Sequence, residues 1–184
     1  EQAIEIVESL DEKRERYKKK RGELEEIRLQ VTKAIQDIEP YRNVNHDIRD
    51  ILHFQSIKFR FGRIPTEYYE KLERYVYDEL STIFYKCQSS AEYIWGVYFV
   101  PATEAEKVDA VYASLHFERF RMPEGYEGTL EEAYEMYTKK MEKTESTIAN
   151  LEAKMEQELL ECLDDIYAAR DELAVLSENF EVRK

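Results

Sequence analysis

The sequence predicts an α+β protein, with a small βαββαβ lobe at the tip of a long antiparallel two-helix coiled-coil hairpin. Two apolar patterns with helical spacing, one in residues 1–39 and one in 148–180, predict the two arms. Short segments in which apolar and polar residues alternate, separated by segments with helical spacing, predict the lobe between the two arms. We place the outgoing helix at 1–51, the lobe at 52–128 and the return helix at 129–184.

Composition agrees with long helices and argues against several classes of function. Charged residues make up 36% of the 184 residues, and the chain has only five Gly and four Pro, as is typical of charge-rich helices. The net charge of −13 disfavours nucleic-acid binding, because the chain repels polyphosphate. No apolar stretch or signal peptide predicts direct membrane insertion. Because the chain begins at Glu1 rather than Met, we expect it to be a piece of a longer protein.

A sevenfold repeat predicts an outgoing helix over residues 1–39. Of the six companion positions three residues further on, four are apolar or aromatic, whereas Lys13 and Lys20 weaken the seam. Pro40 can kink this helix, and we expect the pattern to resume as far as residue 51. The repeat consists of Ala3, Leu10, Tyr17, Leu24, Val31 and Ile38.

A second apolar stripe predicts the return helix, which no Pro or Gly interrupts from residue 129 onward. Thr129 and Glu132 have the spacing of a capping box at its start. Two consecutive steps of four, from Leu151 through Met155 to Leu159, form a stutter that locally relaxes a left-handed supercoil. The stripe consists of Ile148, Leu151, Met155, Leu159, Cys162, Ile166, Ala169, Leu173, Leu176 and Phe180.

The lobe is predicted to contain strand, helix, strand, strand, helix and strand, which is the order of a ferredoxin-like unit. We expect the strand order 4-1-3-2, with the first and third strands central. Thr66 is expected to cap the first helix, and Thr103 with Glu106 to form a capping box on the second. Gly62 is interpreted as a turn residue with positive φ. The expected strands are 55–61, 82–88, 93–100 and 117–122, and the first helix is 66–80.

No pattern in the sequence predicts catalysis or a cofactor. The three histidines have no Ser or Cys nucleophile at a recognisable spacing, and no metal-binding motif or Gly-rich phosphate loop is present. We expect the two cysteines, Cys87 and Cys162, to lie far apart and to be reduced. The histidines, interpreted as surface or packing residues, are His46, His53 and His116.

A basic run at residues 13–21 is the sharpest local charge feature. In an antiparallel hairpin the residue numbers of two facing positions add up to a near-constant sum. We expect this sum to be about 180, because the chain enters the lobe near residue 51 and leaves it near residue 129. The run should then face 159–167, where opposite charges would determine the register. A membrane, a nucleic acid or a separate acidic partner is the alternative. The expected inter-arm charges are Lys13, Arg14, Arg16, Lys20, Arg21, Glu158, Glu161, Asp164 and Asp165.

Several short blocks resemble the V-type and archaeal-type ATPase subunit called I or a. Residues 57–65 (IKFRFGRIP) resemble a strand and turn of that family, and residues 98–101, 107–109 and 115–119 resemble its next block. Residues 123–129 (PEGYEGT) are similar to its exit into the return helix. The resemblance covers about residues 50–135, whereas the arms match only as generic coiled coil.

The resemblance implies a non-catalytic stator element in the cytoplasmic half of a membrane-bound rotary ATPase. This element would dock a peripheral-stalk heterodimer of E and G type subunits, contact other ATPase subunits and resist rotor torque during proton or sodium transport. The alternative is a coiled-coil scaffold for protein–protein interaction, unrelated to an ATPase. Edge strands are available to partners, so we expect the stalk contact at Thr82, Phe84, Lys86, Gln88, Arg119 and Arg121.

Overall fold

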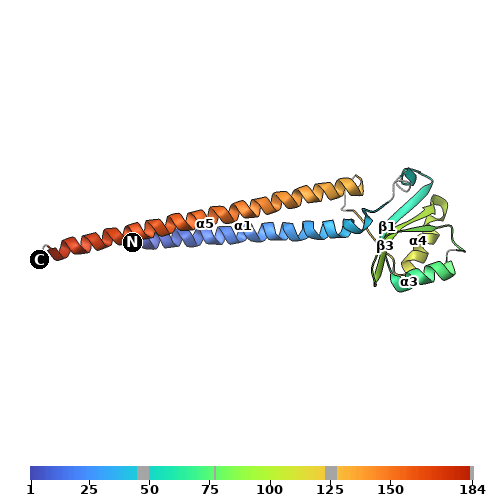
Figure 1. Ribbon diagram of the computed structural model, residues 1–184, viewed down its shortest axis with the longest axis horizontal. Coiled ribbons are helices and arrows are strands. Elements are labelled where there is room, and N and C mark those ends of the chain that lie inside the picture. Colours follow the sequence, from blue (N-terminus) through green and yellow to red (C-terminus); the bar gives the residue numbers. More distant parts are fainter. Residues whose placement is uncertain (45–49, 77, 123–127, 183–184) are drawn as a thin grey trace. The chain divides into compact units, whose positions relative to one another are not determined.

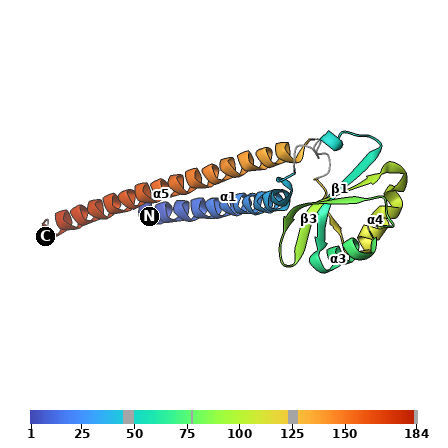
Figure 2. The same ribbon diagram turned by 45° about the vertical axis from the view of Figure 1, so that its right-hand side comes forward.

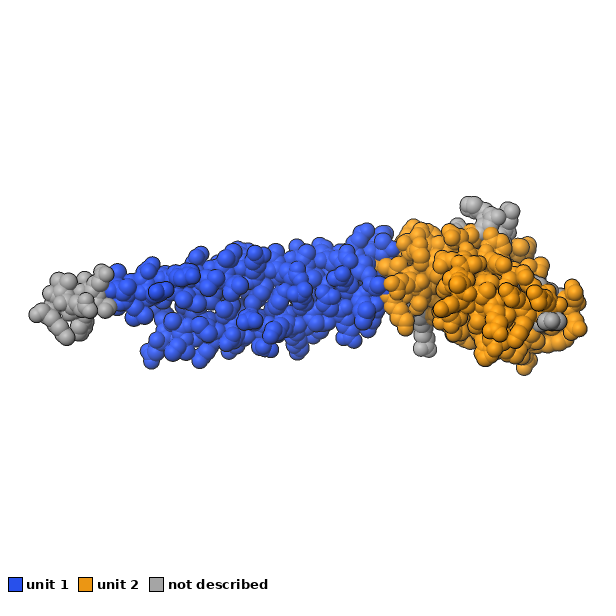
Figure 3. Space-filling model, turned by 60° about the horizontal axis from the view of Figure 1, so that its bottom comes forward, with its two compact units in different colours: residues 1–32, 138–184 blue, residues 33–137 orange. Residues whose placement is uncertain are grey.

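The computed structural model describes residues 1–44, 50–76, 78–122 and 128–182 (Figure 1). They form two compact units, which are coloured separately in Figure 3. The helical unit consists of residues 1–32 and 138–184, and the sheet unit consists of residues 33–137. Two helices contribute to both units, namely α1 (Gln2–Ile38) and α5 (Leu130–Val182).

In the helical unit α1 and α5 lie side by side and run in opposite directions (Figures 1 and 2). The predicted seam of α1 is confirmed, since its apolar heptad positions are buried or half-buried, whereas Lys13 and Lys20 are exposed. On α5 the seam passes through Glu158, which is half-buried, while Leu159 is 40% exposed. The stutter therefore lies seven residues later than predicted, from Glu158 through Cys162 to Ile166.

The sheet unit contains a four-stranded antiparallel sheet. Its strand order is β2-β3-β1-β4, which confirms the predicted order 4-1-3-2. Three expectations stay predictions, namely the ferredoxin-like classification, the position of the lobe at the tip of the hairpin, and the domain bounds at 52 and 128. The strands are β1 (Ile57–Pro65), β2 (Ile83–Ser89), β3 (Tyr93–Pro101) and β4 (Glu118–Arg119).

Gly62 lies inside β1 and not in a turn, so the interpretation of this residue was wrong. It pairs with Gly96 on β3 and with Arg119 on β4. A Cβ atom at this position would overlap the ring of Phe117 and the carbonyl oxygen of Glu118. Glycine is therefore required here by a close approach of neighbouring groups, and β1 continues to Pro65.

The helices of the sheet unit are short, and two of their predicted caps are absent. Helix α3 (Thr66–Lys71) continues as a π-helical turn, η2 (Leu72–Val76), and has Pro65 at its N-cap. Because Thr66 is already helical, its hydroxyl cannot cap and instead donates to the C=O of Ser90 at 3.4 Å. Helix α4 (Ala105–Ser114) follows a 3₁₀ turn, η3 (Ala102–Glu104), which places Thr103 before the Glu104 N-cap.

The predicted cap of α5 is confirmed, since the N–H of Glu132 donates to the Thr129 hydroxyl at 3.1 Å. The spacing of a capping box thus identified a helix start where the preceding residues are not helical. It failed where a strand or a 3₁₀ turn leads directly into the helix.

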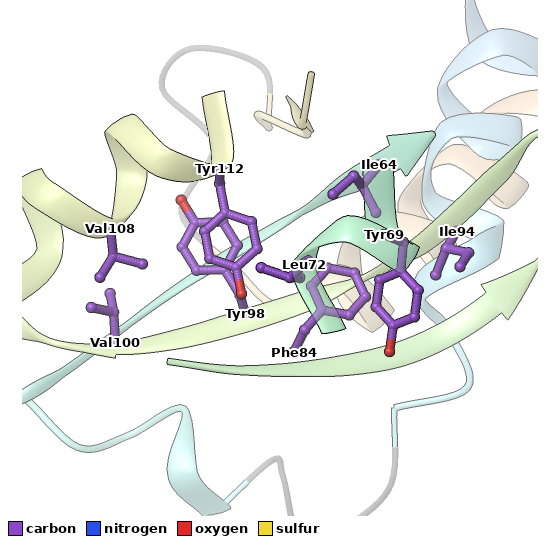
Figure 4. Close-up of a cluster of buried hydrophobic side chains, with 9 residues drawn as sticks. All are labelled: Ile64, Tyr69, Leu72, Phe84, Ile94, Tyr98, Val100, Val108 and Tyr112. Atoms are coloured by element: carbon purple, nitrogen blue, oxygen red, sulfur yellow. The ribbon is translucent and has the colours of Figure 1, made fainter. Parts of the chain in front are cut away.

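One face of the sheet packs against α3, η2 and α4 and forms the main hydrophobic core (Figure 4). The rings of Tyr98 and Tyr112 stack with centroids 3.7 Å apart and an interplanar angle of 1°. The hydroxyl of Tyr98 also bonds to the carboxylate of Asp109. The cluster consists of Ile64, Tyr69, Leu72, Phe84, Ile94, Tyr98, Val100, Val108 and Tyr112.

The opposite face of the sheet is also apolar, because β3 is hydrophobic at both alternating sets of positions and β1 places Ile57, Phe59 and Phe61 on this face. Val97 is fully buried there. Tyr41, from the 3₁₀ turn η1 (Glu39–Tyr41), packs against Phe61 and Phe120 with ring centroids 5.4 and 5.3 Å away. Both faces of the sheet are thus covered by residues of the same unit.

Candidate partner-binding surfaces

The strand order leaves β2 at one edge of the sheet and β4 at the other. At the β2 edge Phe84 is not available to a partner, because it is 7% exposed and belongs to the core. Thr82 is also engaged internally, since its hydroxyl donates to the C=O of Phe99 at 2.9 Å. Lys86 extends over the ring of Tyr69, with Nζ 4.4 Å from the centroid, and Gln88 is exposed.

The pairing of β2 with β3 is irregular between Lys86 and Gln88. Lys86 pairs with Gly96 and Gln88 pairs with Trp95, so Cys87 is an extra residue that forms a β-bulge. Bulges bend and twist an edge strand, and natural proteins use them to discourage pairing with other chains. The β2 edge is therefore poorly suited to accept another strand.

At the other edge, β4 contains only two residues, whereas the sequence predicted a strand over 117–122. The N–H of Phe120 still donates to the C=O of Phe61 at 2.8 Å. Arg121 and Met122 then leave the sheet, so Arg119 lies in β4 and Arg121 lies just beyond it. Both arginines are exposed.

Next to this edge lies a pocket of about 760 Å³ within the sheet unit, which we name the arginine pocket. Aromatic and aliphatic side chains form most of its wall, and four arginines and one glutamate contribute the charged groups. It is lined by Tyr41, Arg42, Val44, Leu52, His53, Phe59, Arg60, Phe61, Arg119, Phe120, Arg121, Met122, Gly128, Thr129, Leu130 and Glu131.

Two of these arginines are held by groups of the sheet unit. Arg60 Nη2 lies 3.5 Å from the Asp109 carboxylate, and Arg60 Nη1 donates to the C=O of Phe59 at 3.1 Å. Arg42 Nη2 lies 3.4 Å from Glu131, and its guanidinium lies 3.6 Å from the ring centroid of Tyr134. These contacts keep both side chains at the wall of the pocket.

Arg119 lies in a locally positive environment. Burial lowers the pKa of its guanidinium, and the neighbouring charges of Arg60 and Arg121 lower it further. Within the described ranges, no ion pair engages Arg119 or Arg121. Arg119 and Arg121 were predicted from the sequence, whereas Arg42 and Arg60, which come from distant segments, were not. The Lys58-Phe59-Arg60-Phe61 alternation was the available signal for Arg60.

In the helical unit, the register differs from the predicted one. Cys162 Sγ lies 3.9 Å from the C=O of Ile6, and Arg21 Nη2 lies 2.9 Å from Glu152. Facing residue numbers thus total 168 at the first pair and 173 at the second, rather than about 180. The predicted sum was too large because it placed the end of the outgoing helix near residue 51, whereas α1 ends at Ile38. Since α5 starts at Leu130, the two helix ends also give a sum of 168.

The basic run therefore faces residues on the N-terminal side of the predicted acidic cluster. Arg21 pairs with Glu152, which was not among the expected partners. Lys13 lines the same groove as Glu158 and Glu161. Among the described side chains, no ion pair joins the run to the cluster Glu158, Glu161, Asp164 and Asp165. Electrostatic pairing of its other cations across the two helices stays a prediction.

The other residues considered in the sequence analysis are the cysteines and the histidines. The described residues contain no group of three His, Cys, Asp or Glu side chains placed to hold a metal ion. Cys87 and Cys162 are free and belong to different units, and burial raises the pKa of the Cys87 thiol to about 11. His53 lines the arginine pocket, His116 stacks near Tyr68 with ring centroids 4.5 Å apart, and His46 lies outside the described residues.

Comparison with known proteins relates the chain to a solved structure. Neither family models nor curated protein sequences match it. The crystal structure of the cytoplasmic N-terminal domain of subunit I, homolog of subunit a, of V-ATPase aligns with a TM-score of 0.55 and 14% identity. The alignment covers 94% of this chain. The chain has the fold of that domain.

The chain covers 58% of the subunit I structure, so it corresponds to little more than half of that domain. The match agrees with the family resemblance found in the sequence blocks, and at this level of identity it concerns the fold. No helix in the part of the chain that the structure describes is long and apolar enough to cross a membrane.

Proposed function

We propose that this chain is a non-catalytic stator element from the cytoplasmic region of a V-type ATPase subunit I (subunit a). In this role it docks the peripheral stalk and helps the complex to resist rotor torque during proton or sodium transport. The observation that carries the proposal is the match to the subunit I domain along 94% of the chain. The sequence blocks in 57–65 and 98–129, which occur in the order of that family, support it independently.

The helical unit has the properties that a torque-bearing element needs. The 53 residues of α5 give a helix of about 80 Å at the usual rise per residue. A helix packed along a seam against a second helix resists bending better than a helix alone. Neither helix needs an active site for this work, because the element transmits force while hydrolysis takes place in other subunits.

The sheet unit supplies the surfaces on which a partner can dock. We propose that a stalk heterodimer of E and G type contacts one of its two edges, at Thr82, Lys86 and Gln88 or at Arg119 and Arg121. Other ATPase subunits would contact the remainder of the element. The protein would then act on the cytoplasmic side of a membrane-bound complex.

Co-purification tests the proposal. The full-length parent protein, tagged and co-expressed with the E and G type subunits of its own genome, should retain them on the affinity resin. Arg119→Glu/Arg121→Glu and Lys86→Glu/Gln88→Glu distinguish the two edges, and Arg74→Glu/Lys107→Glu, at exposed sites elsewhere in the sheet unit, is the control. Retention of neither subunit, or a parent gene without membrane spans after this region, would favour the coiled-coil scaffold.

Calorimetry tests the non-catalytic part of the proposal. We expect no heat of binding when ATP is titrated into the chain, because no Gly-rich loop precedes a helix in the sequence. ATP binding at micromolar affinity would contradict this assignment.

A further inference from the structure

We propose that the arginine pocket binds an extended acidic segment of a partner protein, which adds a strand beside the N-terminal half of β1. This inference does not rest on the stator proposal, because it uses only the charge, the lining and the strand pairing of the sheet unit.

Charge complementarity identifies the ligand as acidic. The described residues of the lining include four arginines and one glutamate, a net charge of +3 with His53 neutral, whereas the whole chain carries −13. An acidic chain has many carboxylates with which to pair its arginines. Four of its arginines nevertheless gather around this one pocket. Opposite potentials across an interface favour encounter and select the partner.

Unpartnered donors at the pocket wall indicate that the ligand supplies hydrogen-bond acceptors. The Nε atoms of Arg42 and Arg60 are buried and have no hydrogen-bond partner among the described residues, although their terminal nitrogens have carboxylate neighbours. A buried donor without an acceptor is unfavourable, and such groups are rare in folded proteins. Carboxylate oxygens would supply these acceptors once the two guanidinium groups turn toward the ligand, because their Nε atoms have almost no accessible surface in the structure. They would also reduce the repulsion that Arg60 and Arg121 exert on Arg119.

The open edge of β1 indicates that the ligand is extended. β1 has nine residues and β4 has two, so β4 accompanies only the C-terminal part of β1. The last bond between them runs from Phe120 N–H to Phe61 C=O. Backbone groups alternate in direction along a strand, so those of Ile57 and Phe59 point to the same side as Phe61 C=O. The C=O of Phe59 accepts from Arg60 Nη1 at 3.1 Å, a contact that the added strand would replace. Within the described ranges, no strand pairs with β1 on that side before Phe61.

The side chains along this edge define the pattern that a ligand strand would show. Phe59 and Phe61 point to one face of the sheet, and Lys58 and Arg60 point to the other, because side chains alternate along a strand. A strand paired with residues 57–60 would place alternate side chains beside Ile57 and Phe59 on one face and beside Lys58 and Arg60 on the other. Apolar residues alternating with Asp or Glu fit this arrangement.

The same reasoning excludes the β2 edge as the site of strand addition. The bulge at Cys87 interrupts the backbone pattern there. Edge pairing supplies affinity through main-chain hydrogen bonds, and the pockets for alternate side chains supply specificity. The β1 edge combines both features.

Fluorescence anisotropy with a labelled peptide tests the inference on the whole chain. The probe is a peptide of about eight residues that alternates glutamate with isoleucine or phenylalanine. We expect saturable binding that weakens as salt is raised. Arg119→Gln/Arg121→Gln should weaken binding by at least about tenfold, because it removes two of the four pocket cations. The matched control, Arg74→Gln/Lys107→Gln, removes two exposed charges elsewhere in the sheet unit and should bind as the unchanged chain does.

Two further probes separate strand addition from other modes of binding. Methylation of alternate backbone nitrogens in the peptide keeps its charge but prevents edge pairing, so this peptide should not bind measurably. A peptide with lysine in place of glutamate should not bind either. Equal binding of the methylated peptide, or no effect of Arg119→Gln/Arg121→Gln, would overturn the inference. Binding to phosphatidylserine vesicles without binding to any acidic peptide would assign the pocket to a lipid surface instead.

Discussion

The helical unit and the sheet unit bury their side chains in different ways. Among the described residues of the helical unit, those that are buried are Val31, Thr144 and Ile148, and the other seam positions between the two helices are only half-buried. In the sheet unit both faces of the sheet are covered, and Leu72, Val97 and Tyr112 are fully buried. A pair of helices can hide only one stripe of each, whereas a covered sheet forms an enclosed core. The same kind of substitution should therefore have different consequences in the two units.

Truncation of a leucine should show the largest difference. We expect Leu72→Ala, in the core of the sheet unit, to lower the free energy of unfolding by about 3 kcal/mol, because it removes buried contacts and leaves a cavity. The control is Leu173→Ala on α5, where the side chain is 64% exposed and truncation should have little effect. Urea denaturation of both variants measures the difference. Equal losses would show that the helical unit is packed more tightly than its exposure indicates.

Replacing a glycine by alanine should have opposite effects on stability in the two units. Gly62→Ala should destabilise the sheet unit by about 2 kcal/mol, because the new Cβ overlaps Phe117 and the Glu118 carbonyl. Gly22 lies within α1, and a Cβ atom added there would meet nothing within 4 Å. Gly22→Ala should therefore stabilise the helical unit by about 0.5–1 kcal/mol through helix propensity. Thermal unfolding of the two variants checks the signs, and a loss of stability in Gly22→Ala would contradict this account.

Removal of a helix cap should have a smaller effect. Thr129→Ala removes the hydroxyl that accepts from the Glu132 N–H, and we expect a loss of about 1 kcal/mol. Thr103→Ala is the matched control, because Thr103 precedes the Glu104 N-cap and no hydroxyl caps α4. Urea denaturation compares the two variants. A larger loss for Thr103 would mean that the hydroxyl has a role that its position does not explain.

The ion pair between Arg21 and Glu152 should show the smallest effect. Both side chains are 45% exposed, so water and salt screen their attraction. We expect a double-mutant cycle with Arg21→Gln and Glu152→Gln to give a weak favourable coupling at low salt, and none at high salt. A coupling that persists at high salt would mean that the pair contributes to stability and not only to register.

The arrangement of the elements could be predicted from periodicity, because the patterns are local. The heptad of α1, the start of α5 at Thr129 and the strand order all agree with the structure. Three errors have non-local causes. Gly62 is required by Phe117, which is 55 residues away in sequence. The register between α1 and α5 depends on where α1 ends, at Ile38. Leu159 was assigned to the seam because it is hydrophobic, whereas in the structure the seam passes through Glu158.

The candidate site was predicted only in part for a similar reason. Arg119 and Arg121 could be identified because they lie in an expected edge strand. Arg42 and Arg60 reach the same pocket from the turn that follows α1 and from a central strand, and no spacing in the sequence connects them. Phe84 was assigned to the edge because strand alternation does not show which face of a strand is covered.

The single tryptophan gives the two units separate optical signals. Trp95 lies on β3, half-buried and with its ring centroid 6.0 Å from that of Tyr93, so indole fluorescence responds to the sheet unit. Circular dichroism at the helix band is dominated instead by α1 and α5, which contain most of the helical residues. A melt followed by fluorescence and a melt followed by circular dichroism therefore observe different parts of the same chain. Transitions that do not coincide would indicate independent unfolding of the two units rather than a partly folded form of either one.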